Sequence, residues 1–216
     1  MREAVKDVRP YSSKRRQEAA EATRQVILEA ARKLFERDGY VSTSMQAIAK
    51  EAEVAVKTIY LAYDGKAALL REVWRNRLAP GEADIPVLKR RWYRDVLDDN
   101  DPRQKLRLLV EHSVSVKTRS AALLETIREA SSADTDVADL WTEIDTKLQQ
   151  VAHDFIRELA VTGALRPALT QHEAADVLWA LNHPAMWQLL VAKQGWAFAQ
   201  YAGWLERTLA GELLRG

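Results

Sequence analysis

The chain has 216 residues, no cysteine, and nearly balanced charge, with 32 basic and 31 acidic side chains. This length can bury a sizeable core, either as one large domain or as a small domain joined to a larger one. The lack of cysteine excludes disulfides and thiolate metal sites. No apolar stretch approaches the roughly 18 residues of a membrane span, so we expect no membrane partner and a cytoplasmic location.

Positive charge collects at the N-terminus. Residues 1–16 carry six Lys or Arg side chains and two acidic ones, whereas the chain beyond residue 70 is slightly acidic. This distribution is typical of a nucleic-acid-binding head attached to a body with another role. Residues 1–20 are therefore predicted to form a basic arm, and the alternative for residues 1–12 is a solvated, disordered tail.

Three helices are predicted between residues 24 and 70. The first is an amphipathic run, with apolar residues three and four apart, that stops at Asp38-Gly39. Thr43-Ser-Met-Gln46 has the form of a capping box, which would open a second helix with Thr43 as its N-cap. The third helix begins at Val56 and ends near Tyr63-Asp64-Gly65. Two short helices joined by a tight turn and braced by a longer one form a helix-turn-helix, whose second short helix enters the major groove of DNA.

The order of these residues resembles the TetR family of transcriptional regulators. The resemblance covers about the first third of the chain, and the remainder is similar to the family only in length and helical character. The matching residues are Ile27-Leu-Glu-Ala-Ala31, Leu34-Phe35, Gly39-Tyr40, Thr43-Ser44-Met45, Ile48-Ala49, Ala52, Val54, Thr58-Ile59-Tyr60, Tyr63, Lys66 and Leu69-Leu70.

The resemblance implies an all-α fold with two parts. Residues 21–66 would form a three-helix helix-turn-helix DNA-binding head, and residues 67–216 a larger helical bundle for ligand binding and dimerisation. The protein would then be a ligand-responsive regulator, most often a repressor, that binds a palindromic double-stranded DNA operator as a homodimer. Its effector would be a small molecule, and neither a cofactor nor a metal is expected.

The resemblance also implies roles for individual residues. Residues at the positions of Thr58, Tyr60 and Lys66 contact the DNA backbone in the family, and those around Val56 and Lys57 approach base edges. Their chemistry agrees, because hydroxyl, phenol and ammonium groups donate to phosphates, while a valine can contact a thymine methyl. The alternative is that Tyr60 is a packing aromatic and Lys66 a solvated charge. The full set of candidate DNA-binding residues is Thr43, Ser44, Gln46, Val56, Lys57, Thr58, Tyr60 and Lys66.

Two positions depart from the family pattern. Glu53 stands in the turn between the short helices, where a small residue, often glycine, is usual. A left-handed conformation there would cost a non-glycine residue about 1–2 kcal/mol. Ala55 precedes the third helix, where a hydroxyl cap is usual, and loss of that cap costs about 1 kcal/mol.

The rest of the chain also reads as helical, since no segment alternates with period two. A helix is predicted from Lys66 to Leu78, followed by a loop bracketed by Pro80 and Pro86. Asp101-Pro102 is typical of an N-cap followed by proline at the first helical position. The predicted helices then cover residues 103–120, 137–162, 171–194 and 196–214, and Pro184 is expected to kink the third of these.

The run Lys89-Arg-Arg-Trp-Tyr-Arg94 mixes cations with aromatic rings, which alone would suggest nucleic acid or an anionic ligand. Because it lies outside the DNA-binding module, we favour a solvated face with Trp92 packed inward.

The C-terminal third is rich in tryptophan and predicts a dimer interface. An all-round apolar helix must be buried, either in its own chain or against a second copy. TetR-like proteins dimerise through their last two long helices, and a core within one chain is the alternative. The candidate interface residues are Trp179, Trp187, Tyr201, Trp204 and Leu205.

A few polar residues beside apolar faces predict a ligand pocket among helices 103–120, 137–162 and 171–194. Pockets combine a mostly apolar lining with a few convergent polar groups. The alternative is that these residues are solvated or satisfied by structural contacts. The candidate pocket residues are Ser113, Lys117, Trp141, Asn182 and His183.

Catalysis has no positive support in the sequence. There is no nucleophile elbow, phosphate-binding glycine loop or dinucleotide fingerprint. The four histidines, His112, His153, His172 and His183, include no pair at helical spacing, so no metal site is predicted. The competing hypotheses are a helical binding or scaffold protein without DNA regulation, and a helical-bundle enzyme.

Overall fold

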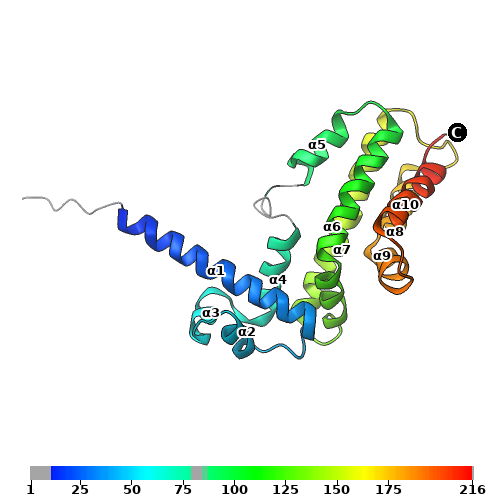
Figure 1. Cartoon of the computed structure of the whole chain (residues 1–216). Helices are drawn as coiled ribbons and strands as arrows, with labels where there is room; N and C mark the ends of the chain where they lie inside the picture. Colours follow the sequence, from blue (N-terminus) through cyan, green and yellow to red (C-terminus); the bar gives the residue numbers. More distant parts are fainter. Residues whose placement is uncertain (1–10, 79–84, 86, 216) are drawn as a thin grey trace, which may run out of the picture. The chain divides into compact units, whose positions relative to one another are not determined.

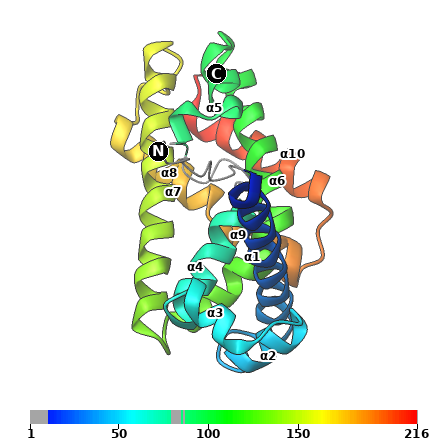
Figure 2. The same ribbon diagram turned by 90° about the vertical axis from the view of Figure 1, so that its left-hand side faces the viewer.

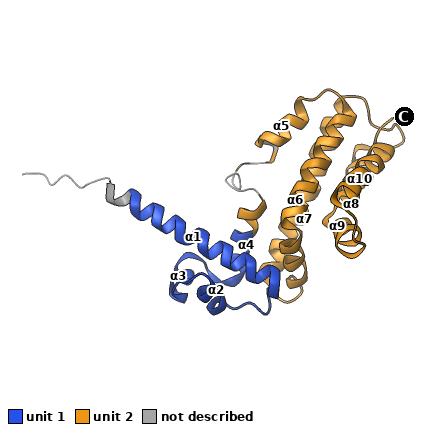
Figure 3. Ribbon diagram, viewed as in Figure 1, with its two compact units in different colours: residues 1–73 blue, residues 74–216 orange. Residues whose placement is uncertain are grey.

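The computed structural model describes residues 11–78, 85 and 87–215, which are helical almost throughout (Figure 1). Within these residues the only β-type pairing is a single bridge between Leu165 and Leu214, so the all-α prediction is confirmed. The described chain divides into two compact units between Val73 and Trp74 (Figure 3). The sequence prediction placed this boundary between residues 66 and 67.

The first unit contains α1 (Tyr11–Asp38), α2 (Met45–Glu51), α3 (Val56–Ala62) and the first part of α4 (Gly65–Leu78). α1 ends where predicted, because Gly39 adopts a left-handed φ of 80°. It starts much earlier than predicted, so residues 11–20 are helix rather than a separate arm. The physical reason is that residues 11–38 contain neither glycine nor proline. Residues 1–10 of the predicted arm lie outside the described residues.

The core of this unit is built from apolar side chains at helical spacing on all four helices. These positions bring α2 against α1 and α3 against α2, and they leave the N-terminal part of α1, residues 14–22, exposed. The fully buried members are Ile27, Ala31, Phe35, Ile48, Ile59, Leu69 and Leu70.

The second unit is a helical bundle. Its elements after α4 are η1 (Val87–Lys89), α5 (Arg91–Asp98), α6 (Pro102–Ala130), α7 (Thr135–Val161), α8 (Gln171–Asn182), α9 (Pro184–Trp187), the π-helical η2 (Gln188–Lys193) and α10 (Phe198–Leu213). The long helices α6 and α7 run alongside each other, α8 packs on α7, and α10 packs on both α6 and α8 (Figures 1 and 2). Across the described part of the chain, no helix combines the length and apolar character needed to span a membrane.

Several local predictions hold in this unit. Asp101 caps α6 by accepting from the Arg103 amide, with Pro102 at the first helical position. α7 ends before Gly163, whose φ is 69°. The Pro80–Pro86 loop lies largely outside the described residues. α5 was not predicted; its Trp92 is half-buried and stacks on His112 with ring centroids 3.6 Å apart, in line with the inward packing we favoured.

The predicted helix 171–194 is wrong as a single element. α8 stops at Asn182, because the backbone of His183 is extended. The side chain of His183 caps α9 by accepting from the Ala185 amide. Proline lacks the amide hydrogen that would continue the helix, and it disfavours a helical conformation in the residue before it. Pro184 therefore divides the segment instead of merely kinking it.

The core of the bundle lies among α6, α7, α8 and α10, with Val96 of α5 added at its edge. Lys105 of α6 is buried in this region, and its ammonium donates to the carbonyl oxygens of Val96 (3.1 Å) and Leu97 (2.6 Å). These carbonyls belong to the last turn of α5, where no amide within the helix can reach them. Lys105 therefore fixes the end of α5 against α6.

Candidate nucleic-acid interface and effector cavity

The turn between α2 and α3 has the geometry of a helix-turn-helix. Glu53 adopts a φ of 54°, and the Val54 amide donates to the Ala49 carbonyl oxygen at 3.0 Å. The expected left-handed position is therefore confirmed at Glu53, where the side chain carries the steric cost that glycine would avoid.

The N-cap of α2 differs from the prediction. Ser44, not Thr43, caps the helix by accepting from the Ala47 amide at 3.1 Å. The Thr43 side chain is buried and its hydroxyl donates to the Gly39 carbonyl oxygen at 2.7 Å. The capping-box prediction is therefore wrong. As a candidate DNA contact, Thr43 is also corrected, because its hydroxyl lies inside the head.

α3 exposes one face and anchors the other. Ile59 is fully buried, Val56 and Thr58 are half-buried, and Lys57 and Tyr60 are exposed. On α2, the side chains of Ser44 and Gln46 are exposed as well. Sequence reasoning missed Leu61, which is 79% exposed at the end of α3. Its apolar character beside Lys57 and Tyr60 is the signal that would have drawn attention to it.

Ala55 occupies the N-cap position of α3 and makes no side-chain hydrogen bond, as expected. The first amides of this seven-residue helix therefore lack the acceptor that a serine or threonine would supply.

Lys66 lies in the first turn of α4 and is half-buried. Its ammonium donates to the carbonyl oxygens of Tyr40 (2.8 Å) and Thr43 (2.9 Å) and lies 4.2 Å from the centroid of the Tyr40 ring. The ammonium thus holds the turn between α1 and α2 against α4. This bracing role was not foreseen from the sequence, which predicted only a phosphate contact.

Comparison with known proteins agrees with this geometry. Residues 27–73 match the sequence profile described as bacterial regulatory proteins, tetR family. Residues 27–73 therefore carry the sequence signature of the TetR family, and this match covers most of the first unit.

Two relatives are transcriptional regulators of the helix-turn-helix type. HbdR of Aromatoleum sp. (strain CIB) is 27% identical over 169 residues, which are 76% of this chain and 71% of the relative. AcrR of Shigella flexneri is 35% identical over 117 residues, 53% of this chain and about half (51%) of the relative.

Solved structures share the fold. A transcriptional regulator from Saccharomonospora viridis, in complex with choline, has a TM-score of 0.72 at 22% identity and covers 91% of this chain and 100% of its own. NalD of Pseudomonas aeruginosa, the secondary repressor of the MexAB-OprM multidrug efflux pump, has a TM-score of 0.70 at 23% identity, with 92% and 98% covered.

The second unit contains a cavity of about 310 Å³. Three of the five predicted pocket residues line it: Lys117 of α6, Trp141 of α7 and His183 at the α8–α9 break. Ser113 and Asn182 do not line it, but both contact Lys117. The rest of the lining is Ser120, Ala121, Leu124, Glu125, Arg128, Pro184, Ala185, Trp187, Gln188, Leu189 and Lys193.

Lys117 is a buried charged residue in the lining of this cavity. It is 6% exposed, and its ammonium donates to Ser113 Oγ (2.7 Å) and Asn182 Oδ1 (2.6 Å), while Ser113 also donates to Asn182 Oδ1 at 2.7 Å. Burial lowers the pKa of Lys117 to about 7, and no interaction with a carboxylate raises it again. The bonds to Asn182 tie the middle of α6 to the last residue of α8.

His183 lines the cavity at the break between α8 and α9. Its Nδ1 accepts from the Ala185 amide at 3.1 Å, which leaves the proton of the neutral ring on Nε2, 3.4 Å from Asp145 Oδ1. Desolvation, partly offset by Asp145, lowers the pKa of His183, so the ring is neutral near pH 7. The rings of Trp141 and Trp179 stand edge-on to it.

The predicted dimer-interface residues divide into two groups. Trp187, Tyr201 and Leu205 are at most 4% exposed within the single chain. They belong to the core around α10, so they are corrected from interface to core residues. Trp179 and Trp204 are half-buried, so part of each ring remains accessible.

Relief of the left-handed strain at Glu53 gives the first prediction. Glu53→Gly should stabilise the α2–α3 turn by about 0.5–1 kcal/mol, because the steric gain exceeds the entropy that glycine loses on folding. Amide hydrogen exchange of α3 measures this as slower exchange. Glu53→Ala is the control and should gain nothing, since it keeps a Cβ. Equal protection in both variants would contradict the strain argument.

The second prediction concerns the effect of the buried Lys117 ammonium on how stability depends on pH. Between the lowered folded pKa of about 7 and the ordinary pKa of an unfolded lysine, about 10.4, the unfolded chain holds more protons at Lys117 than the folded one. This residue therefore makes stability rise with pH across that window, by up to about 1.4 kcal/mol per pH unit.

Urea unfolding of the wild type and Lys117→Met between pH 7 and pH 9 checks this. The variant should lose that contribution to the slope, whereas the exposed cavity residue Lys193, changed to Met, should leave the slope as in the wild type. Parallel pH profiles for the wild type and Lys117→Met would refute it.

Proposed function

We propose that this TetR-family chain is a ligand-responsive transcriptional repressor that binds a palindromic DNA operator as a homodimer. The observation that carries the proposal is α3, which exposes Lys57 and Tyr60 while Ile59 anchors the helix in the head. The relatives named as transcriptional regulators, and NalD, named as a repressor, support the same class of function.

Within each head, α3 is the recognition helix. Lys57, at its second position, is the proposed base-reading cation, because an ammonium can donate to guanine O6 and N7 in the major groove. Tyr60 and Thr58 supply hydroxyls for phosphates, and Val56 supplies an apolar contact to a thymine methyl. Ser44 and Gln46 extend this surface from the start of α2. The two heads of a dimer would enter major grooves about 34–36 Å apart, or a multiple of that spacing.

The third prediction follows from the different roles proposed for Lys57, which would contact bases, and Lys66, which would contact a phosphate. Lys57→Ala should relax the preference at one base step and cost about 1–3 kcal/mol per half-site. Lys66→Ala should weaken binding to all sequences alike and also lower the stability of the head, since the carbonyl oxygens of Tyr40 and Thr43 each lose one donor, and that of Tyr40 keeps the Thr43 amide.

The operator is first identified by selecting genomic DNA fragments that bind the purified protein. The affinity of each variant is then measured by titration on this operator and on its single-base variants, at several salt concentrations. If Lys66 contacts a phosphate, Lys66→Ala should make the salt slope shallower by about one unit per head, because one counterion fewer is released on binding. Lys147→Ala, an exposed lysine of α7, is the control. Salt-insensitive binding, or unchanged base preference in Lys57→Ala, would contradict the proposed interface.

The dimer is proposed to form through α8 and α10. Apolar surface remains on this side of the second unit after the chain has folded: Trp179 and Trp204 are half-buried, and Phe198 is 50% exposed. A palindromic operator requires two-fold symmetry, which a pair of identical helices packed on each other provides.

The fourth prediction concerns this interface. Trp204→Glu should convert dimers to monomers in analytical ultracentrifugation while circular dichroism stays unchanged, because a charge at a symmetric contact faces its own copy. Val161→Glu is the matched control, since Val161 is an 83% exposed apolar residue at the end of α7. A monomeric wild type at micromolar concentration, or a dimeric Trp204→Glu, would remove the proposal.

The cavity is proposed to bind the effector, an organic anion with an aromatic or aliphatic body. Its walls include Trp141, Trp187, Leu124 and Leu189, and its charged lining is mainly positive: Lys117, Arg128 and Lys193 against Glu125, which Arg128 already pairs at 2.5 Å. A buried ammonium without a carboxylate partner gains most from an anionic ligand. Calorimetric titration of candidate acids and their neutral amides into the wild type and Lys117→Met tests this preference.

The contacts of Lys117 suggest how binding could reach the rest of the second unit. An anion that draws the ammonium from Asn182 would weaken the link between α6 and the end of α8, directly before the break at His183. DNA would be released only if the ligand favours a dimer geometry in which the heads are wrongly spaced, because a ligand must discriminate between two states to shift them.

A further inference from the structure

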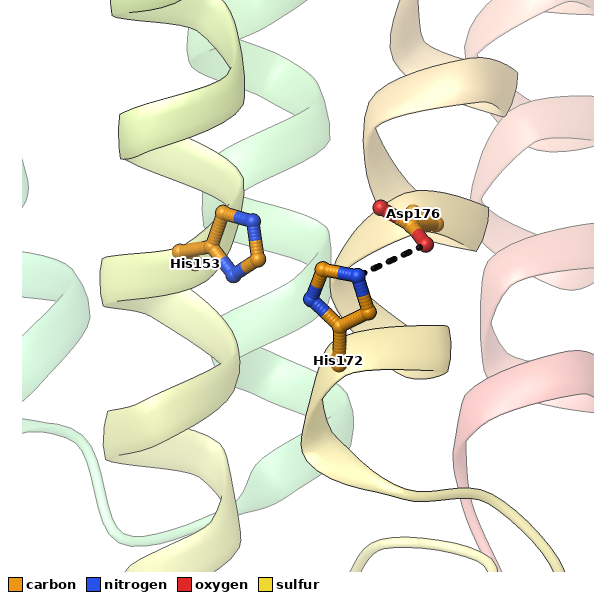
Figure 4. Close-up of side chains that lie close together, drawn as sticks. All are labelled: His153, His172 and Asp176. Carbon is orange, nitrogen blue, oxygen red and sulfur yellow. Dashed lines mark ion pairs between the residues drawn. The ribbon is translucent and has the colours of Figure 1, made fainter.

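A cluster of two histidines and an aspartate lies across α7 and α8, away from the cavity lining (Figure 4). His153 extends from α7, and His172 and Asp176 extend from successive turns of α8, with His172 between the other two. One potential ligand atom from each residue lies within 4.8 Å of the others. The two imidazole rings are stacked at 5.4 Å, and His172 Nε2 lies 3.6 Å from Asp176 Oδ2.

We propose that His153, His172 and Asp176 form a binding site for a divalent metal ion of the zinc type. Two imidazole nitrogens and one carboxylate oxygen are the donor set of open zinc sites, in which water takes the fourth position. The same set disfavours Mg²⁺ and Ca²⁺, which take oxygen ligands in larger number. This site is independent of the DNA-binding and effector functions proposed above.

The backbone on both sides of the site is held in place. His153 is flanked by the buried Ala152 and by Phe155 on α7, while Ala174 and Ala175 of α8 are buried between His172 and Asp176. The first turn of α8 is further fixed by the capping box of Thr170 and Glu173. The positions from which the three ligands extend are therefore set by core packing.

Only the side chains have to move to reach coordination distance. Ligand atoms around a tetrahedral zinc lie about 3.4 Å apart, given zinc–nitrogen and zinc–oxygen distances of about 2.0–2.2 Å. His172 and Asp176 have side-chain exposures of 76% and 60%, so both can rotate without displacing core residues. Among the described residues, no side-chain hydrogen bond occupies the ring nitrogens of His153, so coordination there displaces only solvent.

The charges around the site favour a cation. Asp176 contributes a carboxylate directly, and Glu173 lies close enough to His172 to interact with it electrostatically. The bound ion would join α7 to α8 through one ligand on the first helix and two on the second. Because a ligand that binds only the folded state stabilises it, metal binding should raise the unfolding temperature of the second unit.

Calorimetric titration of Zn²⁺ into the chelator-treated, tag-free protein tests the site. The expected result is one ion per chain with micromolar affinity, and Co²⁺ in its place should give visible d–d absorption. His153→Ala, His172→Ala and Asp176→Asn should each lower the affinity by at least about tenfold. The double variant His153→Ala/His172→Ala should also lose the zinc-dependent rise in unfolding temperature. Mg²⁺ at millimolar concentration should have no effect.

Gln171→Ala is the matched control, because Gln171 is an exposed neighbour of His172 that carries no metal-binding group. It should bind zinc as the wild type does. Three results would overturn the proposal: zinc binding retained by the double histidine variant, no binding by the wild type at micromolar zinc, or one ion per two chains, which would place the ion between copies.

Discussion

Free carbonyl groups at helix ends and turns are the constraint on which much of this all-helical structure depends. Each helix leaves its last four carbonyls without a donor in the same helix, and an unsatisfied buried one costs about 1–3 kcal/mol. Lysine side chains donate hydrogen bonds to several carbonyls at helix ends and turns. Lys66 donates to Tyr40 and Thr43 in the head, and Lys105 donates to Val96 and Leu97 at the end of α5. These ammonium groups fix where short elements stop and how they meet the next helix.

Lys117 differs from those lysines because its partners are side chains. Ser113 Oγ and Asn182 Oδ1 can rotate away and find other partners, whereas a backbone carbonyl at a fixed helix end cannot. Lys117 lines the cavity, and Asn182 is the last residue of α8, directly before the break at His183 and Pro184. A charged ligand interacts most strongly with a buried ammonium whose present partners can be exchanged. The interrupted helix beside Lys117 is an element whose position such binding could change.

The head carries two local costs at α3, the proposed recognition helix. Glu53 holds a left-handed conformation without being glycine, and Ala55 leaves α3 without a side-chain cap. A seven-residue helix cannot offset these costs by its own propensity, so its stability comes from the burial of Ile59 and from the packing of α2 on α1. Contacts with DNA would add stability to the same helix, which would couple the ordering of α3 to the proposed DNA binding.

The sequence by itself determined the elements whose signals are local. Gly39 ends α1, Asp101-Pro102 starts α6, and Glu53 and Ala55 mark the strained turn and the uncapped helix, because φ and capping depend on a few neighbouring residues. Tertiary structure alone decided the partners of side chains. It buried Thr43 and gave the cap to Ser44, drew Tyr201 and Leu205 into the core, and used Lys66 as a brace. It also brought His153 beside His172, 19 positions later in the chain, because α7 and α8 pack together. Apolar spacing along one helix shows which face is buried but not which other helix covers it, because the partner is decided by burial over the whole chain.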